Sequence, residues 1–180
     1  MNSICPTFTT ISDVAAVTAA PFHLYSHMHI GDGNCFYRAL AFRYFQYIRK
    51  DAKRLEKARL VAQGHKDLLF QAGFEEFAFV DFYDEYMSVL NQLHSTEGLL
   101  GLLNLDEAQQ VAVMENAPED HDLWLVLSDL MLSNAVVVHL RFITSAHLKA
   151  NADMYLPFMD DGYTVEMFCN QFVEAMDRYD

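Results

Sequence analysis

The sequence predicts a single, predominantly helical domain. Its 180 residues are 52% apolar, which is enough for a sizeable core and too apolar for a disordered chain. Apolar residues recur at helical spacing along most of the chain, and the second half contains no strong strand pattern. We find no internal repeat and no low-complexity tract.

Residues 1–21 are predicted to form a loosely ordered lead-in to a domain that spans residues 22–180. Small and polar side chains predominate in the lead-in, and two prolines interrupt regular structure there. Beyond it, Tyr25–Ser26 is compatible with a short strand that runs into a turn at Gly31–Gly33.

The turn is followed by a helix that is apolar on nearly every side, which is typical of a central, buried helix. Its apolar residues are Phe36, Ala39, Leu40, Phe42, Tyr44, Phe45 and Ile48. Residues 49–59 then hold half of the basic side chains of the protein. We expect this basic run to form the solvent-exposed face of a second helix.

Residues 65–72 predict a short helix that ends at Gly73 in the left-handed conformation, with Phe74 making the hydrophobic contact of such an end. Large apolar residues recur at helical spacing in the next segment, which indicates core packing. They are Phe79, Phe82, Tyr83, Tyr86, Leu90 and Leu93.

The middle of the chain predicts one exposed and two buried segments. Residues 106–122 are acidic and contain a proline, so we expect an excursion over the surface. Residues 123–132 and 135–148 predict buried helices, although the three consecutive valines at 136–138 also allow a strand.

The last segment predicts a helix that begins at the turn 161–164. Its inner face is expected to consist of Val165, Phe168, Cys169, Phe172 and Met176. Cys169 is therefore expected in the core. With Cys5 and Cys35 it makes three cysteines, which are too few and too scattered for a disulfide scaffold or a zinc site.

The charge balance argues against a general nucleic-acid binder. Lys and Arg total 12 against 25 Asp and Glu, giving a net charge of −13, whereas phosphate binding needs a cationic face. No uncharged apolar stretch is long enough to span a bilayer, and the N-terminus lacks the basic start and apolar run of a signal peptide. We therefore expect a cytoplasmic or nuclear protein that binds neither nucleic acid nor membranes.

Cys35 stands where a helix start would activate a thiol. Gly33 allows a tight turn, and Asp32 or Asn34 can cap the helix through a side-chain oxygen. Cys35 then lies in the first turn, where unpaired N–H groups and the helix dipole favour a thiolate. The same amides can stabilise the oxyanion that forms when a thiolate attacks a carbonyl.

The residues around Cys35 resemble the nucleophile segment of the otubains, the ovarian-tumour-type cysteine proteases that remove ubiquitin. The segment reads DGNCFYRAL over residues 32–40, and further resemblances follow in the same order. Residues 67–76, the stretch LRFITSA at 140–146, and residues 168–176 are similar to the corresponding otubain segments.

The resemblance implies an α+β, papain-like fold, of which this chain covers mainly the helical part and lacks much of the central sheet. Cys35 would be the nucleophile, and the loop at Asp32, supported by Gly33 and Asn34, would form the oxyanion hole. The partner would be ubiquitin or a polyubiquitin chain, whose C-terminal isopeptide bond would be hydrolysed. No cofactor or metal is implied, and the adjoining Tyr37 and Arg38 receive packing or surface positions.

The chain departs from the family's pattern at its C-terminal end. The family's catalytic histidine follows the region that corresponds to residues 176–180, so neither it nor its acidic or amide partner can be carried over. His27, His29 and His139 are expected to be surface or core residues rather than substitute bases. Residues Asp106–Ser128 resemble an insertion.

Three functions remain open at this point. The favoured one is a thiol-dependent deubiquitinase whose activity is impaired in this chain because the catalytic histidine is missing. The second is a non-catalytic ubiquitin-binding or regulatory protein, and the third is a non-functional gene fragment. The ubiquitin linkage that would be preferred and the physiological substrates do not follow from the sequence.

Overall fold

The computed structural model describes residues 34–116, 118–160 and 162–175. The predicted lead-in, the Tyr25–Ser26 strand, Asp32 and Gly33 lie outside these residues. Within them the chain is helical and contains no strand. The helical part of the predicted α+β fold is thus in view, and the sheet stays a prediction.

The helices follow one another with short connections. They are α2 (Cys35–Arg49), α3 (Ala52–Gln63), α4 (His65–Gln71), α5 (Glu76–Gln92), α6 (Thr96–Leu100), the 3₁₀ turn η2 (Gly101–Leu103), α7 (Glu107–Asn116), α8 (His121–Ser128), α9 (Leu130–Ala150), α10 (Ala152–Tyr155), the 3₁₀ turn η3 (Leu156–Phe158), α11 (Val165–Phe168) and the π-helical turn η4 (Cys169–Val173).

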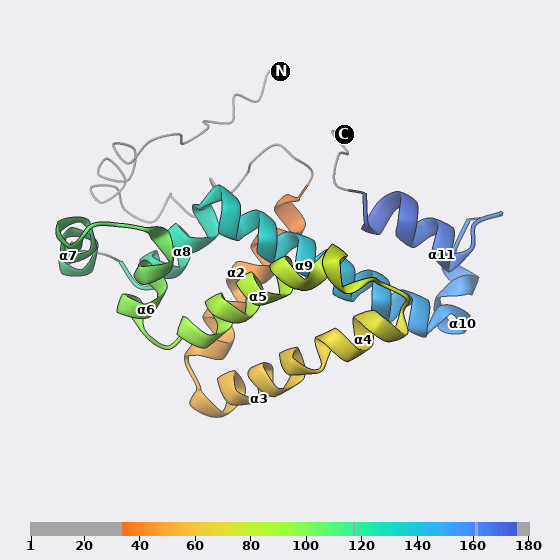
Figure 1. Ribbon diagram of the computed structural model, residues 1–180, viewed down its shortest axis with the longest axis horizontal. Coiled ribbons are helices and arrows are strands. Elements are labelled where there is room, and N and C mark those ends of the chain that lie inside the picture. Colours follow the sequence, from red (N-terminus) through yellow and green to blue (C-terminus); the bar gives the residue numbers. More distant parts are fainter. Residues whose placement is uncertain (1–33, 117, 161, 176–180) are drawn as a thin grey trace, which may run out of the picture.

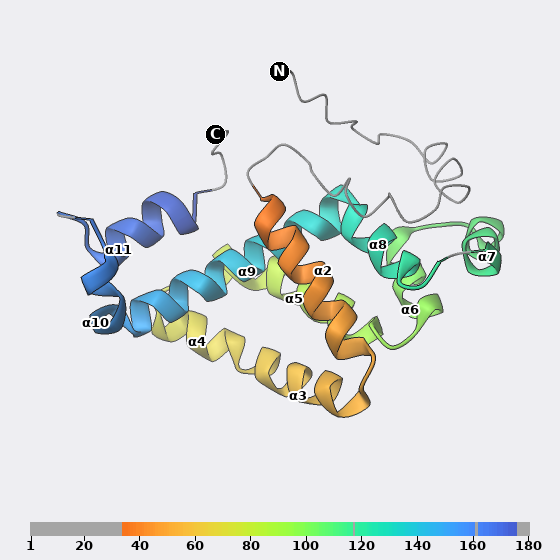
Figure 2. The same cartoon turned by 180° about the vertical axis from the view of Figure 1, so that it is seen from behind.

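Helix α9, the longest of the described helices, is the axis of the bundle (Figure 1). It packs against α2, α4, α5 and α8, and α5 runs alongside it. Seen from behind, α2 crosses α9 and leads into α3 at the edge of the bundle (Figure 2). Helices α6 to α8 form one end of the molecule, and α10 and α11 form the other.

The core forms around the apolar faces that the helical spacing predicts. A large cluster joins α2, α3, α5, α6, α8 and the start of α9, and a smaller one joins α4, α5 and α9. The predicted stripe on α5 is confirmed, because Phe79, Tyr83, Tyr86 and Leu90 are buried. Burial of this apolar area is the main force that holds the helices together.

The predicted end of α4 is also confirmed. Gly73 has a φ of +88°, a conformation that costs glycine little because it has no Cβ. The N–H of Phe74 donates to the Leu69 carbonyl at 3.1 Å, which closes the wider ring of a Schellman motif. Phe74 then packs against the cluster of Leu69 and Phe79.

The prediction of a surface excursion over residues 106–122 is confirmed for most of the segment and wrong for its end. Helix α7 lies at the surface, with Val113 as its buried residue among those described, whereas Asp120 and Asp122 are buried. The guanidinium of Arg49 donates to Asp122 through two hydrogen bonds of 2.9 and 2.7 Å. The last two carboxylates of the acidic run are thus buried against a basic partner from α2, while the earlier ones stay exposed.

The boundary between the two predicted buried helices lies earlier than expected. Helix α8 ends at Ser128, and Asp129 caps α9 by accepting a hydrogen bond from the Leu132 N–H at 2.9 Å. The valines at 136–138 are helical, so the alternative of a strand is wrong. Their continuous burial against neighbouring helices explains why their pattern resembles that of a buried strand.

The last helical segment is wider than predicted, and the predicted inner-face residue Met176 lies outside the described residues. Thr164 caps α11 by accepting from the Met167 N–H at 3.1 Å, and the chain then widens into η4. The wider turn changes the inner face, so Val173 is buried while Phe168 and Phe172 are only partly covered. Cys169 is fully buried, as expected, and its S–H points to the Ser145 carbonyl at 3.8 Å.

Among the described residues, no single helix is long and apolar enough to cross a membrane. Helices α8 and α9 meet that length and composition only when taken together, and they meet at a bend of 84°.

Candidate active site

Cys35 is the first residue of α2, and its thiol is exposed and free of any disulfide. The Asn34 carbonyl accepts the first helical hydrogen bond, from the Arg38 N–H at 3.1 Å. The thiol therefore stands beside the N–H end of a helix of 15 residues, where negative charge is favoured. The structure places Cys35 as the sequence predicts, and its catalytic role stays a prediction.

Contrary to the prediction, the side chain of Asn34 does not cap α2 but binds Arg141. Its side chain makes no capping hydrogen bond to α2, and it is buried rather than facing the helix end in water. Its Oδ1 accepts hydrogen bonds from Nε and Nη2 of Arg141, at 2.9 and 2.6 Å. The residue before the thiol is thus held by a side chain that lies 107 positions away in the sequence.

Arg38 is buried in the core, so a surface position for it is wrong. It is 1% exposed, and it donates to the Ser133 hydroxyl and, at 2.7 Å, to the Asn134 side chain. Tyr37 lies beneath the guanidinium of Arg141, 4.9 Å from the ring centre, so its packing position is confirmed. The spacing of Arg38 to Phe42 and Phe45, on the apolar face of α2, was the available signal, because a charge on that face needs a partner.

One face of α2 is buried and the opposite face is exposed. Ala41, Phe42, Phe45 and Ile48 point into the core. Phe36, Leu40, Tyr44 and Tyr47 lie on the other side, and Phe36 is 68% exposed. Burial of α2 on nearly every side is therefore wrong for this structure, and an apolar stripe starts next to Cys35.

The described histidines have partners other than Cys35. His65 and His139 share a hydrogen bond of 2.9 Å, and the Tyr86 ring lies 4.4 Å from that of His139. Burial, followed by the proximity of His65, lowers the pKa of His139 to about 3. His139 is thus a core residue, as expected, and no hydrogen bond or ion pair joins a described histidine to Cys35.

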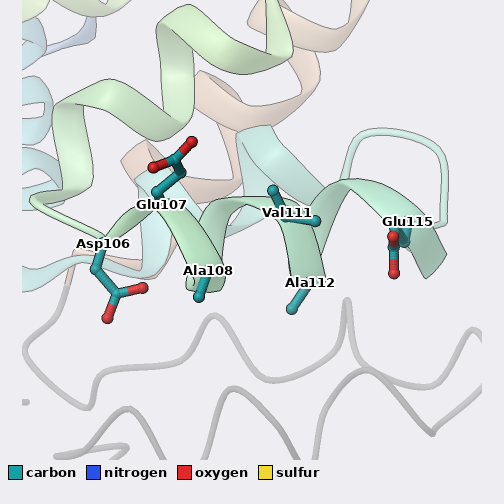
Figure 3. A pocket seen from close by; sticks show the side chains of 6 residues that line it. All are labelled: Asp106, Glu107, Ala108, Val111, Ala112 and Glu115. Carbon is teal, nitrogen blue, oxygen red and sulfur yellow. The ribbon is translucent and has the colours of Figure 1, made fainter.

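A hollow along α7 is a poor alternative site (Figure 3). It is lined by Asp106, Glu107, Ala108, Val111, Ala112 and Glu115. These residues offer carboxylates and small apolar groups, without a nucleophile or a histidine. The exposed thiol of Cys35 therefore remains the predicted nucleophile.

Comparison with known sequences places these observations in a family. Residues 22–179 match the sequence model of the family described as peptidase C65, otubain. This chain belongs to the otubain family. The predicted resemblance is therefore confirmed.

Relatives of the chain in the otubain family are named ubiquitin thioesterases. Ubiquitin thioesterase otubain-like of Caenorhabditis elegans is 33% identical over 146 residues, which are 81% of this chain and 44% of that protein. Human ubiquitin thioesterase OTUB1 is 32% identical over 145 residues, which are 81% of this chain and 46% of that protein. The chain thus spans about half the length of the curated relatives it matches.

Solved otubain structures share the helical arrangement. A ceOTUB1 ubiquitin aldehyde UBC13~Ub complex has a TM-score of 0.63 at 32% identity, over 82% of this chain and 52% of that chain. A complex of h/ceOTUB1 with ubiquitin aldehyde and UBCH5B~Ub has a TM-score of 0.62 at 32% identity, over 81% of this chain and 49% of that chain. The described helices thus have the fold of the corresponding part of these otubains.

Proposed function

We propose that the protein represented by this chain is a thiol-dependent deubiquitinase in which Cys35 is the nucleophile. The supporting observation is an exposed, unpaired thiol at the start of α2, in a chain of the otubain family. The relatives are named ubiquitin thioesterases, and the related solved structures contain ubiquitin aldehyde. The substrate is a ubiquitin conjugate, which supplies a carbonyl for the thiolate to attack.

The reaction proceeds through a thioester. The Cys35 thiolate attacks the carbonyl carbon at the C-terminus of ubiquitin, and the developing oxyanion is stabilised by the N–H groups of the Asp32–Cys35 loop. The C–N bond breaks, and the lysine nitrogen leaves as an amine after it takes up a proton. Water then adds to the thioester carbonyl, and the C–S bond breaks to release the ubiquitin carboxylate and the thiolate.

The proton transfers require a general acid and base from outside the described residues. His65 and His139 are occupied with each other, and His121 stacks on Trp124. We propose that this role belongs to a histidine in the part of the otubain domain that the matched relatives have in addition. An α+β fold with a sheet beyond these helices belongs to the same proposal.

A ubiquitin probe with an electrophile at its C-terminus tests this function. The expected result is a covalent adduct at Cys35, identified by mass spectrometry. Cys35→Ala abolishes the adduct, whereas Cys169→Ala retains it because Cys169 is buried in the core. A folded protein that contains the proposed histidine and forms no adduct overturns the proposal, and binding of ubiquitin without an adduct would favour the non-catalytic alternative.

A further inference from the structure

Arg141 is a buried arginine whose partners are neutral oxygens. It lies on α9 and is 7% exposed. Among the described residues no carboxylate forms an ion pair with it; instead it donates to the Asn34 side chain and to backbone carbonyls. A buried charge is costly unless its hydrogen bonds are made, so this arrangement depends on its geometry.

The guanidinium joins two segments that are far apart in the chain. Nε and Nη2 donate to Asn34 Oδ1, at 2.9 and 2.6 Å. Nη1 donates to the carbonyls of Val173 at 2.8 Å and Ala175 at 3.2 Å, at the end of η4. The loop before Cys35 and the turn that ends the described chain are thereby held against the same side chain of α9.

The planar shape of the guanidinium makes arginine, rather than lysine, suited to this position. A planar fork of N–H donors reaches both segments at once, whereas a lysine ammonium is a single point on a flexible stem. The Tyr37 ring lies against the guanidinium, which fixes its plane further. Arg141→Lys would keep the charge and lose the fork.

These contacts determine how Cys35 is presented. Because Asn34 Oδ1 is engaged by Arg141, it does not turn back onto the N–H groups of the first turn of α2. Those N–H groups are the donors that favour a thiolate at a helix start. Arg141 also fixes the residue that is covalently joined to Cys35, so a shift of Asn34 would move the thiol with it.

We infer that Arg141 is a positioning residue for the nucleophile, acting through Asn34 to hold the loop that presents Cys35. The inference rests on the proposed function for its biological meaning. Its physical content concerns the reactivity of one thiol and requires no ubiquitin. Arg141 does not touch the reacting atoms, so it is not itself a catalytic residue.

The test is the rate at which iodoacetamide alkylates Cys35, measured by mass spectrometry of its peptide in the folded 180-residue chain. Wild type, Arg141→Lys, Asn34→Ala and the double variant are compared between about pH 5 and pH 9, the range over which thiolate formation controls the rate. The matched control is Arg49→Lys, which disturbs another largely buried arginine, at the far end of α2.

We expect Arg141→Lys to slow alkylation about fivefold, the size of a typical effect at a helix terminus, and to change its pH profile. Arg49→Lys should alter neither. The double variant should be no slower than Arg141→Lys, because both changes act through one contact. Additive effects, or an unchanged rate in Arg141→Lys, would overturn the inference.

Two further outcomes separate the claims. If Arg141→Lys does not fold, Asn34→Ala provides the test, because it removes the acceptor and retains the arginine. An unchanged rate of Cys35 alkylation in Asn34→Ala overturns the inference. Absence of an adduct with the ubiquitin probe overturns the proposed function, while the alkylation comparison among variants continues to report on Arg141.

Discussion

The two ends of α2 hold their arginines in different ways. At the C-terminal end, Arg49 forms two hydrogen bonds to Asp122, which also accepts from Thr96 at 2.9 Å. At the N-terminal end, Arg141 is bound by an amide and by carbonyls, next to an exposed thiol. At one end the arginine is neutralised by a carboxylate, whereas at the other it is bound by neutral oxygens next to the proposed nucleophile.

We therefore expect changes at the C-terminal end to alter mainly the free energy of unfolding. Changes at the N-terminal end should alter mainly the reactivity of Cys35. Burial raises the pKa of the Asp122 carboxyl, but hydrogen bonds from Arg49, the nearby charge and other donors outweigh it, and the net shift is downward. The ion pair thus persists at neutral pH. Asn34 has no titrating group, so its contact with Arg141 should not depend on pH in the same way.

The largest effect is expected from breaking the ion pair at the C-terminal end. Asp122→Ala leaves Arg49 largely buried without its main partner, which should lower the free energy of unfolding by about 4 kcal/mol. Chemical denaturation measures this change. Glu119→Ala is the control, because Lys50 and Glu119 pair on the exposed surface and should contribute little. Equal losses in both variants would contradict this account.

The next largest effect concerns His139, which lies midway along α9. Its pKa is about 3 in the folded chain and near 6.5 when unfolded, so the unfolded state binds more protons below pH 6.5. Stability is therefore complete above pH 6.5 and is lost as the pH falls, by about 3 kcal/mol at pH 4. Denaturation midpoints across this range measure the loss.

His139→Phe is the control for that experiment, since it keeps a ring against Tyr86 and removes the titrating group. The groups around His139 are the His65 ring and the rings of Tyr83 and Tyr86. If His139→Phe loses as much stability between pH 6.5 and pH 4 as the wild type, the acid sensitivity arises elsewhere, for instance from His65, whose pKa is also lowered by burial.

A smaller effect is expected from making the N-terminal end resemble the other. Asn34→Asp should give Arg141 a carboxylate partner and place a negative charge beside the thiolate. Two like charges a few ångströms apart near a surface interact by roughly 1 kcal/mol or more, so alkylation of Cys35 should slow about fivefold. Faster alkylation in Asn34→Asp would show that the neutral amide is not what distinguishes this end.

The sequence predicts the faces of helices better than it predicts their partners. The stripe on α5, the end of α4 at Gly73 and the place of Cys35 at a helix start all follow from local spacing. The contact of Arg49 with Asp122 joins residues 73 positions apart. Local periodicity reports which side of a helix is buried and carries no information on which distant residue meets it.

The same limit applies to the candidate site. Cys35 is found from motif and position, whereas the burial of Arg38 and the task of Arg141 depend on where α9 lies in the bundle. The burial of Asp120 and Asp122 is not predictable from the sequence, because a run of carboxylates is ordinarily solvated and only the fold supplies the basic partner. The wide turn η4 likewise has no signal in the spacing of apolar residues.

The corner between α8 and α9 fixes the positions of two residues that contact opposite ends of α2. Asp122, before the corner, contacts the last turn of α2 through Arg49, and Ser133, after it, contacts the first turn through Arg38. The 84° bend therefore sets the two anchoring points a fixed distance apart along α2. One residue inserted at Asp129, the extended residue between the two helices, would change the spacing of the two anchoring points. We therefore expect this corner to tolerate insertions and deletions poorly, and the connection before α7 to tolerate them better. An insertion library screened for folded protein measures this difference.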